Sequence, residues 1–499
     1  MEEAPAMSTN RLVEFLAKPA EEFTKRDIIK FIDKQRIEML NFRCIGGDGR
    51  LKTLNFVVTS KAELDRLLSM GERVDGSSLL PYVDAASSDL YVVPRYKTAY
   101  VNPFATVPTV DILCSYYTSN GTPLPGSPDV IVKKAGQVLR DKTGLSLQAM
   151  GELEYYVIYE SNGLYPVAAQ RGYHESTPFA KWERLRCEAM QLIAQVGGEI
   201  KYGHAEVGEI HEGSREMEQH EIEFLPVPVE DAADQIVIAR WILRMVGYKY
   251  GVTVSFFPKV LAGHAGNGLH VHARLIQNER NMMIEDGRLS DIARKAIAGY
   301  LMLAPSLTAF GNTTPASYLR IVPHQEAPTT LCWGNRNRSV LVRVPLGQSN
   351  ASNMVRDANP RERGEPPRFM DSQTVEFRCP DGSANVHLLL AGLTVATRYG
   401  LETEDALEFA DGLYVEGDIF SPQNGAAREA LPRLPGSCWE SAENLLRDRE
   451  IYERDNVFPP AVVDYTVRQL KRRHESLTDQ SHHEELQSKE LVDECLHCQ

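Results

Sequence analysis

The sequence predicts an α+β or α/β fold divided into at least two domains, and three observations lead to this prediction. A chain of 499 residues is too long for one compact core. The polar, proline- and glycine-rich stretch at residues 118–128 (TSNGTPLPGSP) is the best candidate for a domain boundary. Beyond it, segments with helical periodicity alternate with segments typical of strands. We therefore expect domains at residues 1–127 and 128–478.

The first domain is expected to begin with helices and to continue with a β-hairpin. Residues 1–35 carry apolar side chains at mixed three- and four-residue spacing, which indicates helix. Two short apolar segments, residues 39–44 and 54–58, lie on either side of a glycine-rich sequence at residues 46–49 (GGDG). Apolar strands around such a turn are typical of a hairpin.

The second domain is expected to mix helices and strands. Helices are predicted at residues 130–142, 177–196, 229–250 and 289–307, and strands at residues 152–159 and 252–257. After Leu477 the sequence becomes polar, so residues 479–499 are interpreted as a loosely held tail.

The composition excludes several classes of partner. A formal charge of −14 argues against nucleic acids and anionic membranes, since both attract basic surfaces. No segment approaches the roughly 20 uninterrupted apolar residues of a membrane span. The first ten residues lack the apolar stretch of a secretory signal. We therefore expect a cytoplasmic protein with neither a nucleic-acid partner nor a membrane partner.

Glutamates in predicted strands are the first chemical signal. Glu152 and Glu154 are two residues apart, so in a strand they project from the same face. Like charges gathered on one face need a cation between them, and Mg²⁺ or Mn²⁺ suits oxygen ligands. The pair at residues 221–223 (EIE) and Glu376 look similar. The alternative for each is an ordinary solvated strand face.

A glycine- and histidine-containing segment is the second signal. In residues 266–272 (GNGLHVH), the glycines allow close approach of the backbone to a ligand, and His270 and His272 share a strand face. One histidine could bind a metal and the other could donate to a phosphate. The alternative is a pair of surface histidines after a turn.

Arginines in apolar surroundings are the third signal. They are Arg320, Arg338, Arg343 and Arg378. The planar guanidinium binds phosphate and carboxylate oxygens in a bidentate manner. Together with the acidic segments, they suggest metal-assisted phosphoryl transfer. The sequence has no G-x-x-x-x-G-K-[ST] motif, so a P-loop enzyme is not expected.

Taken in order, these segments resemble the glutamine synthetase family over roughly residues 25–478. The motifs stand at residues 75–78 (DGSS), 88–89 (SD), 151–154 (GELE), 204–206 (HAE), 219–222 (QHEI), 256–259 (FFPK), 266–272 (GNGLHVH), 317–328 (SYLRIVPHQEAP), 337–339 (NRS) and 376–381 (EFRCPD). Each is weak alone, but their order is specific. The chain resembles a longer bacterial branch of the type I enzymes.

The resemblance implies a fold, an assembly and a reaction. The fold would be α+β, with an N-terminal β-grasp domain and a glutamine synthetase/guanido kinase-like catalytic domain. Subunits would stack as hexameric rings into a homo-oligomer, a dodecamer. The reaction would join ammonia to glutamate at the expense of ATP, through a γ-glutamyl phosphate intermediate, with two or more Mg²⁺ or Mn²⁺ ions in each active site.

The resemblance also implies roles for individual residues. One metal would be held by Glu154, Glu206 and Glu221, and the other by Glu152, His270 and Glu376. Arg320, Arg378 and Gly266 would bind glutamate or the reacting group, Arg338 and Arg343 the ATP phosphates, and His272 the nucleotide. Asp75 would accept a proton from ammonium in a pocket with Ser78 and Tyr173, at the active site of a neighbouring subunit, and Glu326 would shield the intermediate from water.

The sequence departs from the usual family pattern in one extended place. Glu206 and Glu221 are separated by residues 207–220 (VGEIHEGSREMEQH), longer than the short link usual in the family. Two alternative functions stay open: a γ-glutamyl ligase for a larger amine, since only the amine pocket need differ, and a non-catalytic ring protein.

Overall fold

The computed structural model describes residues 8–322, 327–347, 354–363 and 372–478. Glu326 and the predicted tail at residues 479–499 lie outside the described residues. Within those ranges, none of the helices combines the length and apolar character that crossing a membrane requires.

Helix was predicted over residues 1–35, and the described part of this segment is helical but broken into separate pieces. The described part contains α1 (Arg11–Leu16), a 3₁₀ turn (Ala20–Glu22) and α2 (Lys25–Lys34). Asn10 caps α1 by accepting from the backbone N–H of Leu12 at 2.9 Å. Ala17 then adopts a left-handed conformation with φ 52° and ends the helix two residues before Pro19.

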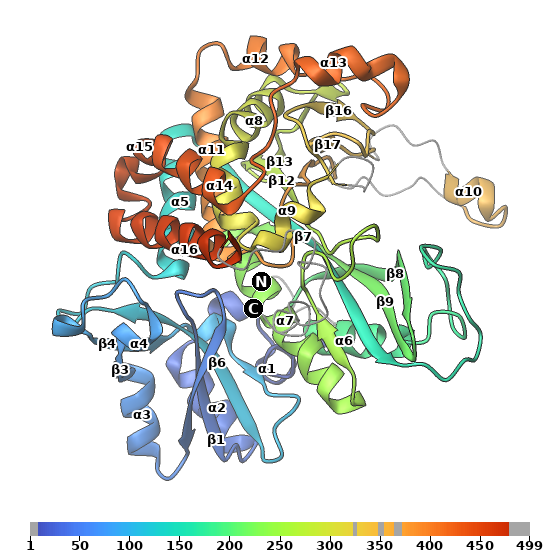
Figure 1. The fold of residues 1–499 in the computed structure, drawn as a ribbon. Helices are drawn as coiled ribbons and strands as arrows, with labels where there is room; N and C mark the ends of the chain where they lie inside the picture. Colours follow the sequence, from blue (N-terminus) through green and yellow to red (C-terminus); the bar gives the residue numbers. More distant parts are fainter. Residues whose placement is uncertain (1–7, 323–326, 348–353, 364–371, 479–499) are drawn as a thin grey trace.

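The predicted hairpin is confirmed and forms one edge of the first sheet. β1 (Met39–Ile45) pairs antiparallel with β2 (Leu51–Val57). The sheet has the order β2-β1-β6-β4-β3, in which β6 runs parallel to β1. The other strands of this sheet are β3 (Glu72–Asp75), β4 (Asp89–Pro94), β5 (Tyr100–Val101) and β6 (Thr109–Tyr117). The same part of the chain contains the helices α3 (Lys61–Met70) and α4 (Gly76–Leu79). This sheet and its helices make up the first domain, drawn in blue in Figure 1.

The second sheet carries most of the predicted site residues. Its order is β16-β17-β18-β12-β7-β9-β8, and β10, β11 and β13 pair at its margins. Its strands are β7 (Ser146–Glu160), β8 (Ile200–Glu212), β9 (Arg215–Phe224), β10 (Val227–Pro228), β11 (Thr253–Ser255), β12 (Leu269–Gln277), β13 (Arg280–Asn281), β16 (Trp333–Asn335), β17 (Val342–Val344) and β18 (Val375–Phe377). A separate ribbon joins β14 (Ile284–Glu285) and β15 (Arg288–Leu289). The predicted strands at residues 152–159 and 252–257 correspond to β7 and β11.

The helices of the second domain are α5 (Pro128–Thr143), α6 (Glu183–Gln195), α7 (Val229–Tyr250), α8 (Asp291–Gly311), α9 (Pro315–Arg320), α10 (Met354–Ala358), α11 (Val386–Glu402), α12 (Ala406–Gly412), α13 (Gly425–Ala430), α14 (Cys438–Arg447), α15 (Arg449–Glu453) and α16 (Pro460–Thr478). The four helices predicted in this domain correspond to α5, α6, α7 and α8, and the later helices were not predicted. The start predicted at residue 177 is wrong. Thr177 donates its N–H to the side chain of Glu183 at 2.7 Å, so the chain turns before the helix begins.

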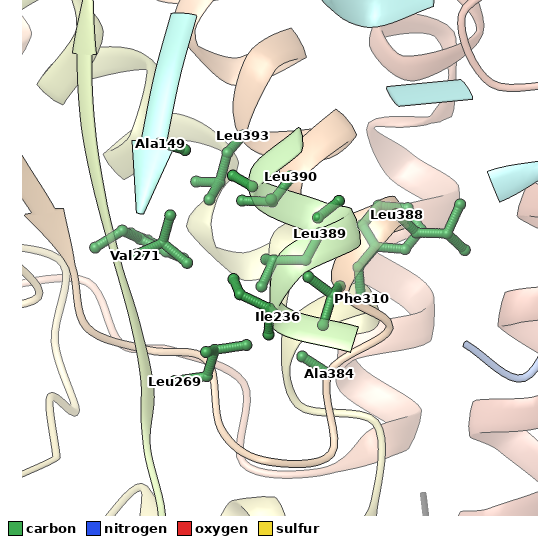
Figure 2. Close-up of a cluster of buried hydrophobic side chains, with 14 of the residues drawn as sticks. Ala149, Ile236, Leu269, Val271, Phe310, Ala384, Leu388, Leu389, Leu390 and Leu393 are labelled. Carbon is green, nitrogen blue, oxygen red and sulfur yellow. The ribbon is translucent and has the colours of Figure 1, made fainter. Parts of the chain in front are cut away.

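The alternation of side chains along the strands separates the core from the site. Leu269 and Val271 of β12 pack toward Ile236 of α7 and Leu389 of α11 (Figure 2). His270 lies between them in sequence and therefore projects to the opposite face. Helices cover one face of the sheet, which leaves the other face free for polar groups.

Two ion pairs join the first domain to α7. Arg95 donates to Asp234 at 2.7 Å, and Asp234 also contacts His387 of α11 at 3.0 Å, in a buried setting. Lys97 lies 2.5 Å from Asp231, and both of these side chains are about one-third exposed. The two pairs therefore differ mainly in burial.

We expect Asp234→Ala to destabilise the protein by about 3–5 kcal/mol, because it leaves the buried His387 and the partly buried Arg95 without their partner. Asp231→Ala is the matched control and should cost less than about 1 kcal/mol, since solvent replaces a partly exposed partner. Denaturant-induced unfolding of both variants measures the difference. Equal losses of unfolding free energy in the two variants would contradict the larger contribution expected of the more buried pair.

Candidate active site

The pairing register of six strands aligns ionisable side chains in a row across one face of the second sheet. Since side chains alternate along each strand, opposed residues share a face. The opposed pairs are His204 with Glu221, Glu221 with Glu154, Glu223 with Glu152, Glu152 with His270, His272 with Glu376, and Glu376 with Arg343. These residues come from β8, β9, β7, β12, β18 and β17.

A cavity of about 1050 Å³ opens over this row. Its lining includes thirteen of the described residues to which the sequence analysis gave a role: Glu152, Glu154, Tyr173, Glu206, Glu221, Gly266, His270, His272, Arg320, Arg338, Arg343, Glu376 and Arg378. Asp75 and Ser78 do not line it. The structure thus brings together the predicted metal, phosphate and nucleotide groups, but not the predicted proton acceptor.

The first acidic cluster centres on Glu152. One carboxylate oxygen lies 2.9 Å from His270 Nδ1 and the other lies 2.9 Å from His272 Nε2. Glu376 Oε1 is 3.6 Å from His270 Nδ1. Burial opposes ionisation of Glu152, but His272 and His270 hold its pKa well below the usual value. The predicted trio of Glu152, His270 and Glu376 therefore converges, with ligand atoms within 4.8 Å of one another.

The second cluster centres on Glu221. Its ligand atoms lie within 4.8 Å of those of Glu154 and His270 in one grouping, and of Glu206 and His204 in another. His204 Nε2 is 3.1 Å from Glu221 Oε1, while its Nδ1 lies 3.0 Å from a backbone carbonyl. Burial and the neighbouring Glu152, Glu154 and Glu206 raise the pKa of Glu221 well above its usual value.

These donor sets fit divalent cations. Carboxylate oxygens with one imidazole in each cluster are the ligands that Mg²⁺ or Mn²⁺ accepts. Glu221 is buried beside the carboxylates of Glu152, Glu154 and Glu206, and burial and these negative charges raise its pKa. A cation between Glu221 and its neighbours would offset these negative charges.

The arginines line the cavity beside these clusters. Arg343 Nη1 lies 2.8 Å from Glu376 Oε2, and Arg378 Nε lies 3.1 Å from Glu376 Oε1. Arg320 donates to the carbonyl of Cys379 at 3.0 Å, which fixes its orientation. A hydrogen bond to Tyr173 raises the pKa of Arg338. The cavity therefore offers several guanidinium groups next to its acidic face, as binding of a polyphosphate requires.

Sequence reasoning assigned no role to several ionisable residues of the cavity, among them His204, Glu223 and Lys201. His204 stands in a quoted motif, and Glu223 belongs to the glutamate pair at residues 221–223, so the sequence had marked both positions. Lys201 lies 2.6 Å from Glu223 at the edge of the same face. No motif marked Lys201, because its position depends on the pairing of β8 with β9.

Asp75 and Ser78 lie together in the first domain. Asp75 caps α4, and Ser78 donates to its carboxylate at 2.7 Å. Hydrogen bonds from Ser78, Ser77 and Ser88 lower the pKa of Asp75 to about 2. An exposed, ionised carboxylate at the end of a strand is available to a group from outside this chain.

Comparison with known proteins identifies the family. The family model described as the catalytic domain of glutamine synthetase matches residues 125–489, and the β-grasp domain of glutamine synthetase matches residues 36–119. The chain belongs to the glutamine synthetase family. It is therefore a ligase, and this family uses ATP and divalent metal ions.

Individual relatives agree with this assignment. The glutamine synthetase of Thermococcus kodakarensis is 30% identical over 82% of this chain and 84% of its own length. That of Mycolicibacterium smegmatis is 27% identical over 91% and 96%. Among solved structures, a glutamine synthetase of Plasmodium falciparum has a TM-score of 0.75 at 19% identity, covering 94% of this chain and 99% of that one. A GmaS/ADP complex has a TM-score of 0.73 at 18% identity, covering 92% and 98%.

Proposed function

We propose that this chain ligates ammonia to the γ-carboxylate of glutamate at the expense of ATP, through γ-glutamyl phosphate. The observation that carries the proposal is the gathering of two acidic clusters and several arginines over one cavity. Phosphoryl transfer depends mainly on positioning and charge neutralisation, and this cavity offers groups for both.

Two cations are proposed to bind on the face of the sheet. Glu154, Glu206 and Glu221 would hold one, and Glu152, His270 and Glu376 the other. Such ions neutralise charge on the transferring phosphoryl group and on the carboxylate that attacks it. His204 and Glu223 are close enough to join these sites or to orient their ligands.

The arginines are proposed to hold the substrates. Arg338 and Arg343 would bind the phosphates of ATP, and Arg320 and Arg378 would bind glutamate and the reacting phosphoryl group. Gly266 supports this placement, because a side chain there would collide with the backbone carbonyl of Pro258 and crowd Arg320. His272, held by Glu152 and Thr374, is proposed to contact the nucleotide.

The amine half of the reaction is proposed to use groups from two subunits. Tyr173 and Glu206 line the cavity, whereas Asp75 and Ser78 do not. In a ring, the loop that carries Asp75 would reach the cavity of the neighbouring subunit and accept the proton of ammonium. Glu326 is proposed to shield the intermediate, since exclusion of water protects an acyl phosphate from hydrolysis.

The assembly proposal predicts the mass of the particle. Two stacked hexameric rings should give about twelve times the mass of one chain in light scattering at working concentration. A monomeric mass in an active preparation would contradict the shared active site.

The competing function is ligation of glutamate to a larger amine. The activated glutamate is common to both reactions, and only the amine pocket separates them. The test is incubation with ATP, Mg²⁺ and glutamate, with ammonia or with a panel of primary amines, followed by identification of the product. Ammonia should give the highest kcat/KM. Preference for an alkylamine would establish the alternative, and absence of ADP formation with every nucleophile would contradict both.

A further inference from the structure

A second group of ionisable side chains lies at the far end of the β8–β9 hairpin, within the segment that is longer than the family's usual link. Glu209 opposes Glu218 and His211 opposes Glu216, so all four side chains share one face of the hairpin. On β9, Glu216 and Glu218 lie an odd number of positions from Glu221 along the strand, so their side chains project from the opposite face. This face is therefore opposite the one that lines the large cavity. None of the four lines that cavity.

The carboxylates of this group are deeply buried, and two of them are well partnered. Glu216 is 6% exposed and accepts from Lys181 and from Tyr159, each at 2.8 Å. Glu218 accepts from the backbone N–H groups of Lys181 and Trp182 at 2.9 and 3.2 Å. Lys181 is thus the cation that compensates Glu216.

Glu209 differs from these two. It is 2% exposed, and among the described residues its Oε1 has no hydrogen-bond partner. Burial, and then the negative charge of Glu218, raises the pKa of Glu209 to about 8. A buried carboxyl in this condition costs free energy unless a proton or a cation neutralises it.

His211 supplies an independent observation. Its Nε2 lies 2.9 Å from the backbone carbonyl of Val167, so this nitrogen carries the proton and donates. In the neutral ring, Nδ1 then presents a lone pair, and it lies 3.6 Å from Glu216 Oε1, which accepts from the Ser161 hydroxyl at 2.5 Å. A cation placed between Nδ1 of His211 and Oε1 of Glu216 could bind to both atoms. A backbone carbonyl on the distal nitrogen is also the usual support of a metal-bound histidine.

We propose that Glu209, His211 and Glu216 form a binding site for a divalent transition metal, with Zn²⁺ as its best representative. Their ligand atoms lie within 4.8 Å of one another. One imidazole and two carboxylates form a set that Zn²⁺ accepts, with water in the remaining position. Mg²⁺ is a poor fit because it prefers an octahedron of oxygens.

The site would fasten the hairpin to a neighbouring loop. His211 contacts the carbonyl of Val167, and Gln170 in the same loop donates its backbone N–H to the carbonyl of Glu209 at 3.2 Å. That loop continues to Tyr173 at the large cavity. A metal bound to this face of the hairpin would therefore restrict the motion of the loop that carries Tyr173. It would not contact the substrates, because this face is opposite the one that lines the large cavity.

Metal content is the decisive measurement. The wild-type chain, Glu209→Gln and His211→Ala are dialysed against micromolar Zn²⁺ with excess Mg²⁺, and bound zinc is counted by mass spectrometry. The wild type should retain one more zinc per chain than either variant. Glu212→Gln is the matched control, because Glu212 is exposed and projects from the opposite face of the same strand; it should retain the wild-type amount.

Thermal unfolding shows whether a metal ion or a proton neutralises the buried carboxyl of Glu209. In chelator, Glu209→Gln should melt at or above the wild-type temperature, because it removes an uncompensated buried carboxyl. With Zn²⁺, the order should reverse. Equal zinc in the wild type and in both variants would overturn the proposal and leave a proton on Glu209 as the neutralising group. His211 is exposed, so His211→Ala keeps the test valid if Glu209→Gln fails to fold. Neither readout depends on the ligase reaction.

Discussion

Glu152→Ala should lower kcat/KM for the ligase reaction by about 10³-fold or more. Glu152 contacts both His270 and His272, so its removal takes one ligand from the proposed metal site and releases the two histidines that it orients. A metal contributes several kcal/mol of charge stabilisation to phosphoryl transfer, and each 1.36 kcal/mol is about tenfold in rate. Steady-state kinetics over a range of Mn²⁺ concentrations measures the effect.

A control on the same strand separates this role from strand stability. Glu160 is exposed at the end of β7. Glu160→Ala should therefore leave kcat/KM within about twofold, as surface substitutions usually do. If Glu152→Ala lost activity with no change in its Mn²⁺ requirement, the residue would be acting through something other than metal binding.

Asp75→Ala should cut glutamine formation by on the order of 10²–10⁴-fold while sparing formation of the glutamyl phosphate. Ammonium has a pKa near ~9, so it reaches the site protonated and must lose a proton to a positioned base. Three serines hold the pKa of Asp75 at about 2, so the carboxylate is ionised at neutral pH. The ionised carboxylate can bind the ammonium cation and accept the proton that ammonium must lose before its nitrogen attacks the acyl phosphate.

Hydroxylamine separates the two halves of the reaction, because it is largely unprotonated at pH 7. It should rescue Asp75→Ala far more than Arg338→Ala, which is expected to impair the phosphoryl step itself. Asp75→Asn should behave like Asp75→Ala, although asparagine keeps the cap of α4. Asp84→Ala removes a similar cap nearby and should be almost fully active. Equal losses with both nucleophiles would mean that Asp75 is not the base.

The local parts of the fold and site could be predicted because they depend on short-range periodicity. Two-residue spacing correctly placed Glu152 with Glu154, and His270 with His272, on a common face. The glycine-rich turn at residues 46–49 fixed the first hairpin, because few connections other than a tight turn fit between such strands. The family motifs then supplied the order of segments that periodicity alone does not give.

The remaining features depend on contacts between distant segments. The sheet order, which brings Glu376 of β18 beside His272 of β12, has no local signature. Lys201 enters the cavity only because β8 pairs with β9. The late start of α6 follows from a fold-back contact of Thr177 with Glu183, which propensity does not reveal. The domain boundary after residue 127 and the roles of the site residues stay predictions.

Direct localisation of manganese tests the central claim, that one face of the second sheet holds two catalytic cations. The protein would be crystallised with Mn²⁺ and ADP, and anomalous difference maps calculated near the manganese edge. We expect one peak among Glu152, His270 and Glu376, and a second among Glu154, Glu206 and Glu221. A map with no peak over this face, or with manganese bound only elsewhere, would contradict the account.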